Sequence, residues 1–303
     1  MSSISAIDES MDGERQLHDT RQAIEARLAE LVDTSRLVPE NLRAAMHHAL
    51  LAPSKRVRPV MVYLLADPSE DLHVAAMDVG CAVEMVHTAS LILDDLPCMD
   101  DAKMRRQRPT AHVAFGEATA ILSAIALLNR AYGILAEIDV LAPAMRARLA
   151  EILSQAVGWD GLVAGQELDI NHRSKLGTHE EIERLNWLKT GVLFVAAAEM
   201  GAVLRGVGDR EIDSLKRFAR HVGLAFQTAD DLLDRTATVA EAGKDVGKDG
   251  GKTTLVSLLG VESARLSFKD HLARADTALL ESGIDPTLPR ALIARLFNLR
   301  AQN

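Results

Sequence analysis

Apolar positions recur at three- and four-residue intervals along nearly the whole chain, and no alternating pattern of useful length predicts a β-strand. Pro59 stands near the start of one such segment, where proline is favoured in a helix. Loops are predicted at 171–178 and at 241–253, a stretch rich in glycine and lysine. We expect helices over residues 19–31, 40–51, 72–96, 114–138, 143–163, 180–204 and 209–233, and again from residue 255, with a break near 283–286.

The pattern predicts one domain. No internal repeat or low-complexity linker divides the 303 residues, and a 48% hydrophobic content is enough to bury a sizeable core. Aromatic residues make up only 3%, and the excess of Ala and Leu favours helix over sheet. We therefore predict an all-α, single-domain helical bundle over residues 17–303, after a disordered polar lead-in at 1–16.

Charge and cysteine content narrow the functional classes. The net charge of −9 argues against a nucleic-acid-binding surface. Cys81 and Cys98 are the only cysteines and suggest no disulfide framework, so we expect a reducing, cytoplasmic compartment. The N-terminus lacks the apolar region of a signal peptide. No uninterrupted run of 18 apolar residues is present, so no membrane span is expected.

Two aspartate clusters follow long apolar segments, where an uncompensated carboxylate costs several kcal/mol. About 135 residues separate them, and their pairing predicts a shared site for a hard cation such as Mg²⁺. Each cluster alone also fits a solvated acidic helix end or an acidic loop. The predicted metal ligands are Asp94, Asp95 and Asp100 in the first cluster and Asp230, Asp231 and Asp234 in the second.

The spacing within each cluster predicts which aspartates lie close together. Asp230 and Asp234 are four residues apart and share one face of a helix, where their repulsion becomes attraction if a cation binds between them. Pro97 lies between Asp94 and Asp100, and proline cannot continue the helical hydrogen bonds. A kink at Pro97 would bring Asp100 back towards Asp94.

Basic residues close to the clusters predict an anionic, phosphorylated ligand, because carboxylate-bound cations usually serve one. Arginine can bind phosphate with two parallel hydrogen bonds, and lysine acts as a point charge. The glycine-rich stretch is not a P-loop, because the motif spacing and a preceding strand are missing. Any one of these basic residues alone fits a solvated surface charge. They are Lys55, Arg56, Arg58, Arg105, Arg106, Arg108, Lys189, Lys244, Lys248 and Lys252.

Four segments together resemble the trans-polyprenyl diphosphate synthases. LDDLPCMDDAKMRRQRPTAH at 93–112 is similar to the family's first aspartate-rich motif with its two arginines, and FQTADDLLD at 226–234 is similar to the second. KRVRP at 55–59 resembles the family's GKRxRP element, and GKDVGKDGGKTTLVSLLG at 243–260 resembles the loop after the second motif. The chain most resembles bacterial geranylgeranyl diphosphate synthases of the carotenoid pathway.

This resemblance implies a helical bundle around a deep central cavity, usually a homodimer, that uses Mg²⁺ to condense isopentenyl diphosphate head-to-tail with an allylic diphosphate. It implies that the allylic diphosphate is held by Arg105, Lys189, Thr190, Gln227 and Lys244. It implies that isopentenyl diphosphate is held by Lys55, Arg58, His87 and Arg106. The chain departs from the family at Pro53-Ser54, where Gly-Gly is common, and at Gln107, where Gly is common. These positions shape the backbone and bind no ligand, so we expect a different loop geometry there and the same chemistry.

Product length should depend on the residues below the first cluster. Ala89 and Ser90 precede Asp94 by five and four residues, about 6–7.5 Å along a helix. An aromatic ring there would block a growing chain. The small side chains favour a geranylgeranyl product over farnesyl, although they also simply permit close helix packing.

Three alternatives remain at this point. A farnesyl diphosphate synthase differs only in product length. A terpene cyclase normally carries an N-S/T-E type second metal site, which this chain lacks, and a cavity lined with aromatic residues, of which this chain has few. A non-catalytic partner subunit should have lost one or both clusters, yet both are intact.

Overall fold

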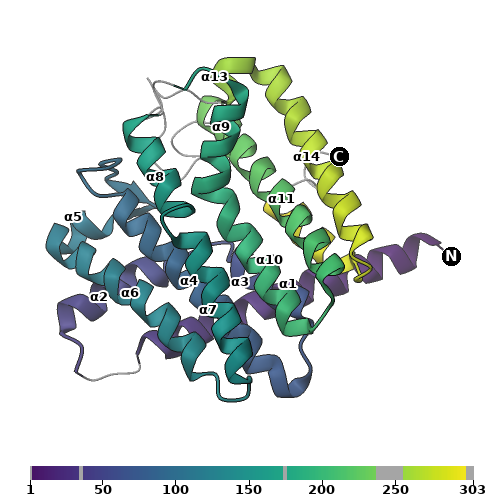
Figure 1. Ribbon diagram of the computed structural model, residues 1–303, viewed down its shortest axis with the longest axis horizontal. Helices are drawn as coiled ribbons and strands as arrows, with labels where there is room; N and C mark the ends of the chain where they lie inside the picture. Colours follow the sequence, from purple (N-terminus) through teal and green to yellow (C-terminus); the bar gives the residue numbers. More distant parts are fainter. Residues whose placement is uncertain (1, 34–36, 173–175, 237–254, 298–303) are drawn as a thin grey trace.

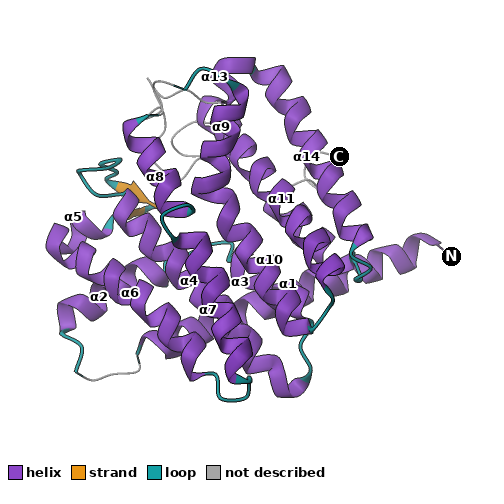
Figure 2. Cartoon of the chain, viewed as in Figure 1, coloured by secondary structure: helices purple, strands orange, loops and turns teal. Residues whose placement is uncertain are grey.

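The computed structural model describes residues 2–33, 37–172, 176–236 and 255–297, and nearly all regular structure within them is helical (Figures 1 and 2). The predicted all-α, single-domain fold is confirmed. The helices of the N-terminal half are α1 (Ser2–Val32), α2 (Glu40–Leu50), α3 (Val57–Ala66), the short 3-10 turn η1 (Glu70–Leu72), α4 (His73–Asp94), α5 (Ala111–Phe115) and α6 (Glu117–Glu137). They are followed by α7 (Pro143–Val157), α8 (Leu162–Asn171), α9 (His179–Asn186), the π-helical η3 (Trp187–Gly191), α10 (Val192–Arg205), α11 (Asp209–Thr236), α13 (Leu255–Leu259), α14 (Val261–Glu281) and α15 (Thr287–Leu296).

Helix α4 is the central element, with α1, α3, α6 and α10 packed around it. Its middle turns are buried on every side, which accounts for a composition that is apolar all round instead of amphipathic. Glycines set the closest approaches. A Cβ atom on Gly80 would lie 3.0 Å from the carbonyl oxygen of Pro59, and one on Gly201 would lie 2.7 Å from that of Val62. Helix α3 is thereby held tightly between α4 and α10.

A small hairpin follows α4 and was not predicted from the sequence. Strand β1 (Met104–Arg105) pairs antiparallel with β2 (Arg108–Pro109), drawn in orange in Figure 2. The two turn residues, Arg106 and Gln107, have φ angles of 52° and 61°. Two-residue hairpin turns favour Gly in this left-handed region, so Gln107 occupies a position at which its backbone is strained.

Three helix boundaries differ from the predictions. Helix α1 begins at Ser2, inside the stretch predicted as a disordered lead-in, and α15 from the far end of the chain packs against α1. The predicted helix 143–163 is broken after Val157, because a Cβ on Gly161 would lie 2.3 Å from the Ala156 carbonyl oxygen. The predicted helix 114–138 is interrupted at Gly116, whose φ is +86°.

Three helical stretches are long and apolar enough to meet the criteria for a membrane span, although the sequence contains no uninterrupted apolar run of 18 residues. By length and mean hydropathy alone, the helical stretches Glu70–Asp94, Glu117–Glu137 and His179–Arg205 could each cross a membrane. The first and third are 78% buried within the fold, so core packing accounts for their composition. The window in Glu117–Glu137 is only 39% buried, which leaves apolar side chains of α6 at the surface.

Candidate active site

The first acidic cluster lies where α4 ends. The backbone N–H of Asp95 still donates to Leu91, after which the chain turns through Pro97. The N–H of Asp100 then donates to the carbonyl oxygen of Asp94 at 3.0 Å. The predicted kink therefore brings Asp100 back beside Asp94.

A third carboxylate completes this cluster. Asp169, in α8, is only 3% exposed, and carboxylate oxygens of Asp94, Asp100 and Asp169 all lie within 4.8 Å of one another. Asp169 is not among the residues that the sequence pattern predicts for the site, because residues 164–170 lie between a predicted helix and a predicted loop. Its one signal was an acid placed three residues after Gln166 in an apolar stretch.

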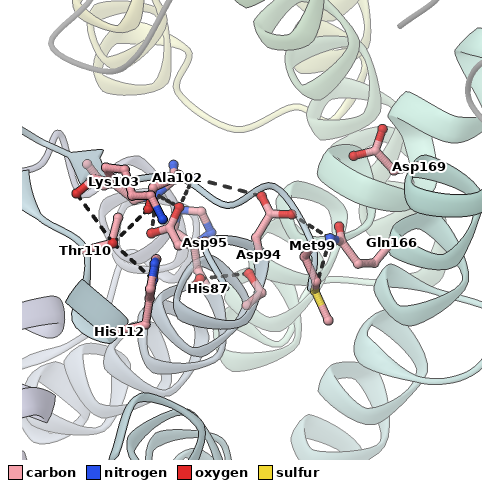
Figure 3. A network of polar contacts seen from close by, with 12 residues as sticks. His87, Asp94, Asp95, Met99, Ala102, Lys103, Thr110, His112, Gln166 and Asp169 are labelled. Atoms are coloured by element: carbon pink, nitrogen blue, oxygen red, sulfur yellow. Dashed lines mark hydrogen bonds and ion pairs between the residues drawn. The ribbon is translucent and has the colours of Figure 1, made fainter. Parts of the chain in front are cut away.

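Gln166 and Lys189 connect these acids, and Figure 3 shows Gln166 bonded to Asp94. Gln166 donates to Asp94 Oδ1 at 2.5 Å, and Lys189 Nζ donates to the same oxygen at 3.2 Å. Lys189 Nζ also donates to Asp169 Oδ2. Burial disfavours the charge of Lys189, but Asp94 and Asp169 outweigh burial and raise the pKa of the amine. The ammonium therefore neutralises part of the buried acidic centre.

Lys189 lies in the π-helical turn η3, where the wider backbone spacing differs from that of the helices on either side. π-helical turns occur often at functional sites. Helix α8 can reach η3 only because residue 165 is glycine: a Cβ there would lie 2.4 Å from the backbone nitrogen of Lys189. Gly165 thus allows Gln166 and Asp169 to approach Lys189.

Asp95 points away from this cluster, since consecutive helical residues are about 100° apart. Its carboxylate accepts two hydrogen bonds from Arg105 Nε at 2.8 Å, and Arg105 Nη2 lies 2.6 Å from Oδ1. Burial raises the pKa of Asp95, and Arg105 opposes that rise. The predicted role of Asp95 as a metal ligand stays a prediction, whereas its contact with Arg105 is direct.

The second acidic cluster is linked to the first through neighbouring residues of η3. Thr190 donates from its hydroxyl to Gln227 Oε1 at 3.0 Å, and Gln227 Nε2 donates to Asp231 Oδ1 at 2.9 Å. Lys189, one residue earlier, contacts Asp94 and Asp169. The turn η3 therefore contacts the first acidic cluster directly and is linked to the second through Gln227. Asp230 lies beside Asp231 near the end of α11, and the side chain of Asp234 lies outside the described part of the chain.

A basic group lies further down α4. Arg58 Nη1 donates to His87 Nε2 at 3.3 Å, and the guanidinium stacks 4.3 Å from the centre of the Phe194 ring. Burial lowers the pKa of Arg58 to about 10. Burial, followed by Arg58 and Arg106, holds the pKa of His87 well below its ordinary value, so the imidazole is neutral near pH 7.

A small pocket with a volume of about 40 Å³ opens beside Asp95. Helix α4 contributes Thr88, Leu91 and Ile92 to its wall, and the hairpin contributes arginines. The deep central cavity that the resemblance implies stays a prediction.

Lys55 and Arg56, which precede α3, have different surroundings. Lys55 Nζ donates to the carbonyl oxygen of Leu296 at the end of α15, and burial lowers the pKa of this lysine. Arg56 is a structural residue, because its guanidinium is buried and bonds to Glu84 at 2.7 Å and to backbone carbonyl groups. Lys244, predicted to hold the allylic diphosphate, lies outside the described residues.

The chain is similar to known proteins over most of its length. The family model described as "Polyprenyl synthetase" matches residues 39–279. The chain is 42% identical to the geranylgeranyl diphosphate synthase of Pantoea ananas over 276 residues, which cover 88% of this chain and 89% of that protein. It is 39% identical to the farnesyl diphosphate synthase of Geobacillus stearothermophilus, over 90% of this chain and 93% of that protein.

A solved structure shows the same fold. The geranyltransferase of Helicobacter pylori, complexed with magnesium and isoprenyl diphosphate, superposes with a TM-score of 0.83 at 29% identity, covering 96% of this chain and 98% of that one.

Proposed function

This chain belongs to the polyprenyl synthetase family and is a prenyltransferase that elongates prenyl chains, and we propose that its product is geranylgeranyl diphosphate. Its substrates are isopentenyl diphosphate and an allylic diphosphate, as membership of the family implies. A farnesyl product is the nearest alternative, because relatives of both kinds are similar over most of the chain.

One observation carries the choice of product: α4 contains no Phe, Tyr or Trp anywhere along its length. Below Asp94 the helix instead presents Ser90, whose hydroxyl is turned back onto the carbonyl oxygen of His87, and the fully buried Ala89. A growing prenyl chain that extends past the acidic cluster therefore meets no rigid ring on this helix.

The acidic cluster fits a hard divalent cation. Oxygens of Asp94, Asp100 and Asp169 lie within 4.8 Å, close to the ~4.2 Å between opposite ligands of octahedral Mg²⁺. We infer that these three residues, with Asp95 beside them and Asp230, Asp231 and Asp234 opposite, hold Mg²⁺. Bound Mg²⁺ supplies Lewis-acid stabilisation of the departing diphosphate.

The basic residues form two sets, and each set would bind one of the two substrates. We infer that Lys189, Arg105, Thr190, Gln227 and Lys244 bind the allylic diphosphate, where negative charge grows as the allylic C–O bond breaks. Arg105 is fixed in place for this role by Asp95. Lys55, Arg58, His87 and Arg106 would orient isopentenyl diphosphate so that its double bond meets the carbocation.

Around the reacting atoms the chain must exclude water, which would capture the carbocation. Ile92 is buried in α4 two residues before Asp94, and Leu96 is buried directly after Asp95. The released diphosphate is the base that we propose for the final proton transfer.

We also propose that the protein is a homodimer. Leu122 and Ile125 are each 56% exposed on α6, and Ile121 is partly exposed beside them. Val113 on α5 adds a further exposed apolar side chain. Exposed apolar side chains grouped on one helix in this way are typical of a subunit interface.

The product assignment is tested by incubating the protein with labelled isopentenyl diphosphate and each allylic primer, and resolving products by length. We expect mainly the C20 product. A mainly C15 output would overturn the geranylgeranyl assignment, and no turnover with any primer would support the non-catalytic partner alternative.

The same assay applied to Ala89→Phe tests the role of α4. We expect a shift towards C15, because the ring narrows the path of the growing chain. Ala89 lies in the core, so overpacking should cost about 1–3 kcal/mol of stability, and thermal unfolding must confirm that the variant is folded at assay temperature. An unchanged product distribution in the folded variant would remove Ala89 from the argument.

A further inference from the structure

A pair of histidines lies away from the acidic clusters, between α11 and α14, which run side by side (Figure 1). His221 Nδ1 and His271 Nδ1 are 3.2 Å apart, and the two rings are inclined by 31°. His271 is 8% exposed, and His221 is partly buried. His221 precedes Asp230 by nine residues, about 13.5 Å along the helix, so the pair does not belong to the catalytic centre.

We propose that His221 and His271 form a second metal site, which binds a borderline transition-metal cation of the Zn²⁺ class and joins α11 to α14. Zinc–nitrogen bonds of 2.0–2.1 Å place two ligands of a tetrahedral ion about 3.3 Å apart. The two Nδ1 atoms are hydrogen-bonded at 3.2 Å, which is close to this separation, so the ion would replace the shared proton and water would take the remaining positions. Imidazole suits Zn²⁺, whereas Mg²⁺ prefers oxygen, so the pair and the aspartates would take different ions.

Glu183, on α9, supports this assignment from the other side of the ring. Its Oε1 lies 3.6 Å from His271 Nε2. At this distance the carboxylate acts on the ring through its charge and not through a direct hydrogen bond, and it favours the tautomer with hydrogen on Nε2, which leaves a lone pair on Nδ1 facing His221. A metal-bound histidine commonly has a carboxylate as its second hydrogen-bond partner.

The charges near the two histidines do not prevent a cation from binding. Arg274 and Arg220 oppose added positive charge, but Arg274 pairs with Asp270 at 2.8 Å and Arg220 stacks on Trp187. Burial is the main reason that the pKa values of both histidines are lowered, and both rings are therefore neutral and able to coordinate near pH 7.

The test uses the full-length protein in saturating Mg²⁺, so that the aspartates are occupied, and measures Zn²⁺ binding by titration calorimetry. Co²⁺ is the optical probe, because a tetrahedral nitrogen site absorbs visible light more strongly than an octahedral oxygen site. The variants are His221→Gln, His271→Gln and Glu183→Gln, with His18→Gln, an exposed histidine on α1, as the matched control.

We expect one Zn²⁺ to bind to the wild type and to His18→Gln, and none at this site in either His221→Gln or His271→Gln. Glu183→Gln should weaken binding about tenfold or more without removing it. Zinc at one hundred times its Kd should raise the Tm of the wild type by about 5 °C over that of His221→Gln.

Equal Zn²⁺ binding in His221→Gln and the wild type would overturn the proposal, and so would no Zn²⁺ binding in the wild type, because the rings would then be a hydrogen-bonded pair only. Circular dichroism identifies any variant that fails to fold. His221→Gln is the decisive variant, since this partly exposed position tolerates substitution better than His271 does.

Discussion

Lys189 shows at the residue scale why the acidic centre is stable without a bound ligand. Buried like charges repel strongly, and each needs a partner of opposite charge or a hydrogen bond. Lys189 contacts both Asp94 and Asp169, and Gln166 adds a further donor to Asp94. The same ammonium is positioned to bind a diphosphate, so one residue serves the free and the substrate-bound site.

Asp169→Asn tests the carboxylate that the structure added to the cluster. We expect kcat to fall on the order of 100-fold, equivalent to about 2.7 kcal/mol of transition-state stabilisation, because the amide cannot replace an anionic ligand. Steady-state kinetics over a range of Mg²⁺ concentrations provides the measurement. Asp139→Asn, at a fully exposed acid, is the control and should keep wild-type activity. Comparable kinetics in both variants would exclude Asp169 from the site.

At the scale of elements, the active site depends on how closely α8 approaches η3. The π-helical turn presents Lys189 to the first acidic cluster and Thr190 to Gln227, which bonds to Asp231 of the second, while α8 supplies Gln166 and Asp169. Gly165 sets the distance between the two elements. A backbone contact therefore decides whether the charged side chains of Asp94, Asp169 and Lys189 meet.

Gly165→Ala should separate these elements. The added methyl group cannot fit 2.4 Å from the backbone of Lys189, so α8 must shift at a cost of about 1–3 kcal/mol in stability. Misplaced catalytic groups should lower kcat/KM at least about tenfold. Gly177→Ala, with open space around its Cβ, is the matched control. Wild-type kcat/KM in a correctly folded Gly165→Ala protein would contradict this role of α8.

The packing of α11 on α14 should depend on pH in the absence of transition metals. Burial lowers the pKa of His221 to about 4 from the ordinary value of 6.5, and the pKa of His271 is lowered as well. Between pH 6.5 and about pH 4 the histidines of the unfolded chain bind protons that those of the folded chain do not. The free energy of unfolding therefore falls as the pH is lowered through this range.

Urea unfolding at about pH 7 and about pH 5 measures the effect. We expect the wild type to lose more stability than His221→Gln over this range, with His18→Gln behaving as the wild type. Equal losses in wild type and His221→Gln would show that the pair does not govern acid stability.

At the scale of the whole molecule, the apolar surface of α6 contrasts with the buried α4. Both helices have the composition of a membrane span, but α4 is enclosed by the fold and α6 is not. Leu122 and Ile125 would be covered in a homodimer, which explains an apolar surface that the monomer leaves open.

Ile125→Asp should therefore convert a dimer to a monomer, because a charge placed in an apolar interface loses its hydration without gaining a partner. Light scattering after size-exclusion chromatography gives the mass directly. Leu266→Asp, at an exposed leucine of α14, is the control and should remain dimeric. A wild type that runs as a monomer at all concentrations would overturn the dimer proposal.

The sequence by itself determined the helices and the type of chemistry. Helical spacing of apolar residues is local information, and most helix boundaries follow it within a few residues. Pro97 forced the turn that joins Asp94 to Asp100, again over a short stretch of chain.

Only the tertiary structure decided which groups meet. Gln166 and Lys189 reach Asp94 across 72 and 95 residues, and Asp169 enters the cluster through the glycine contact of α8 with η3. It also turned Asp95 towards Arg105 and paired His221 with His271. Such contacts depend on the packing of whole helices against each other, and no local pattern in the chain specifies that packing.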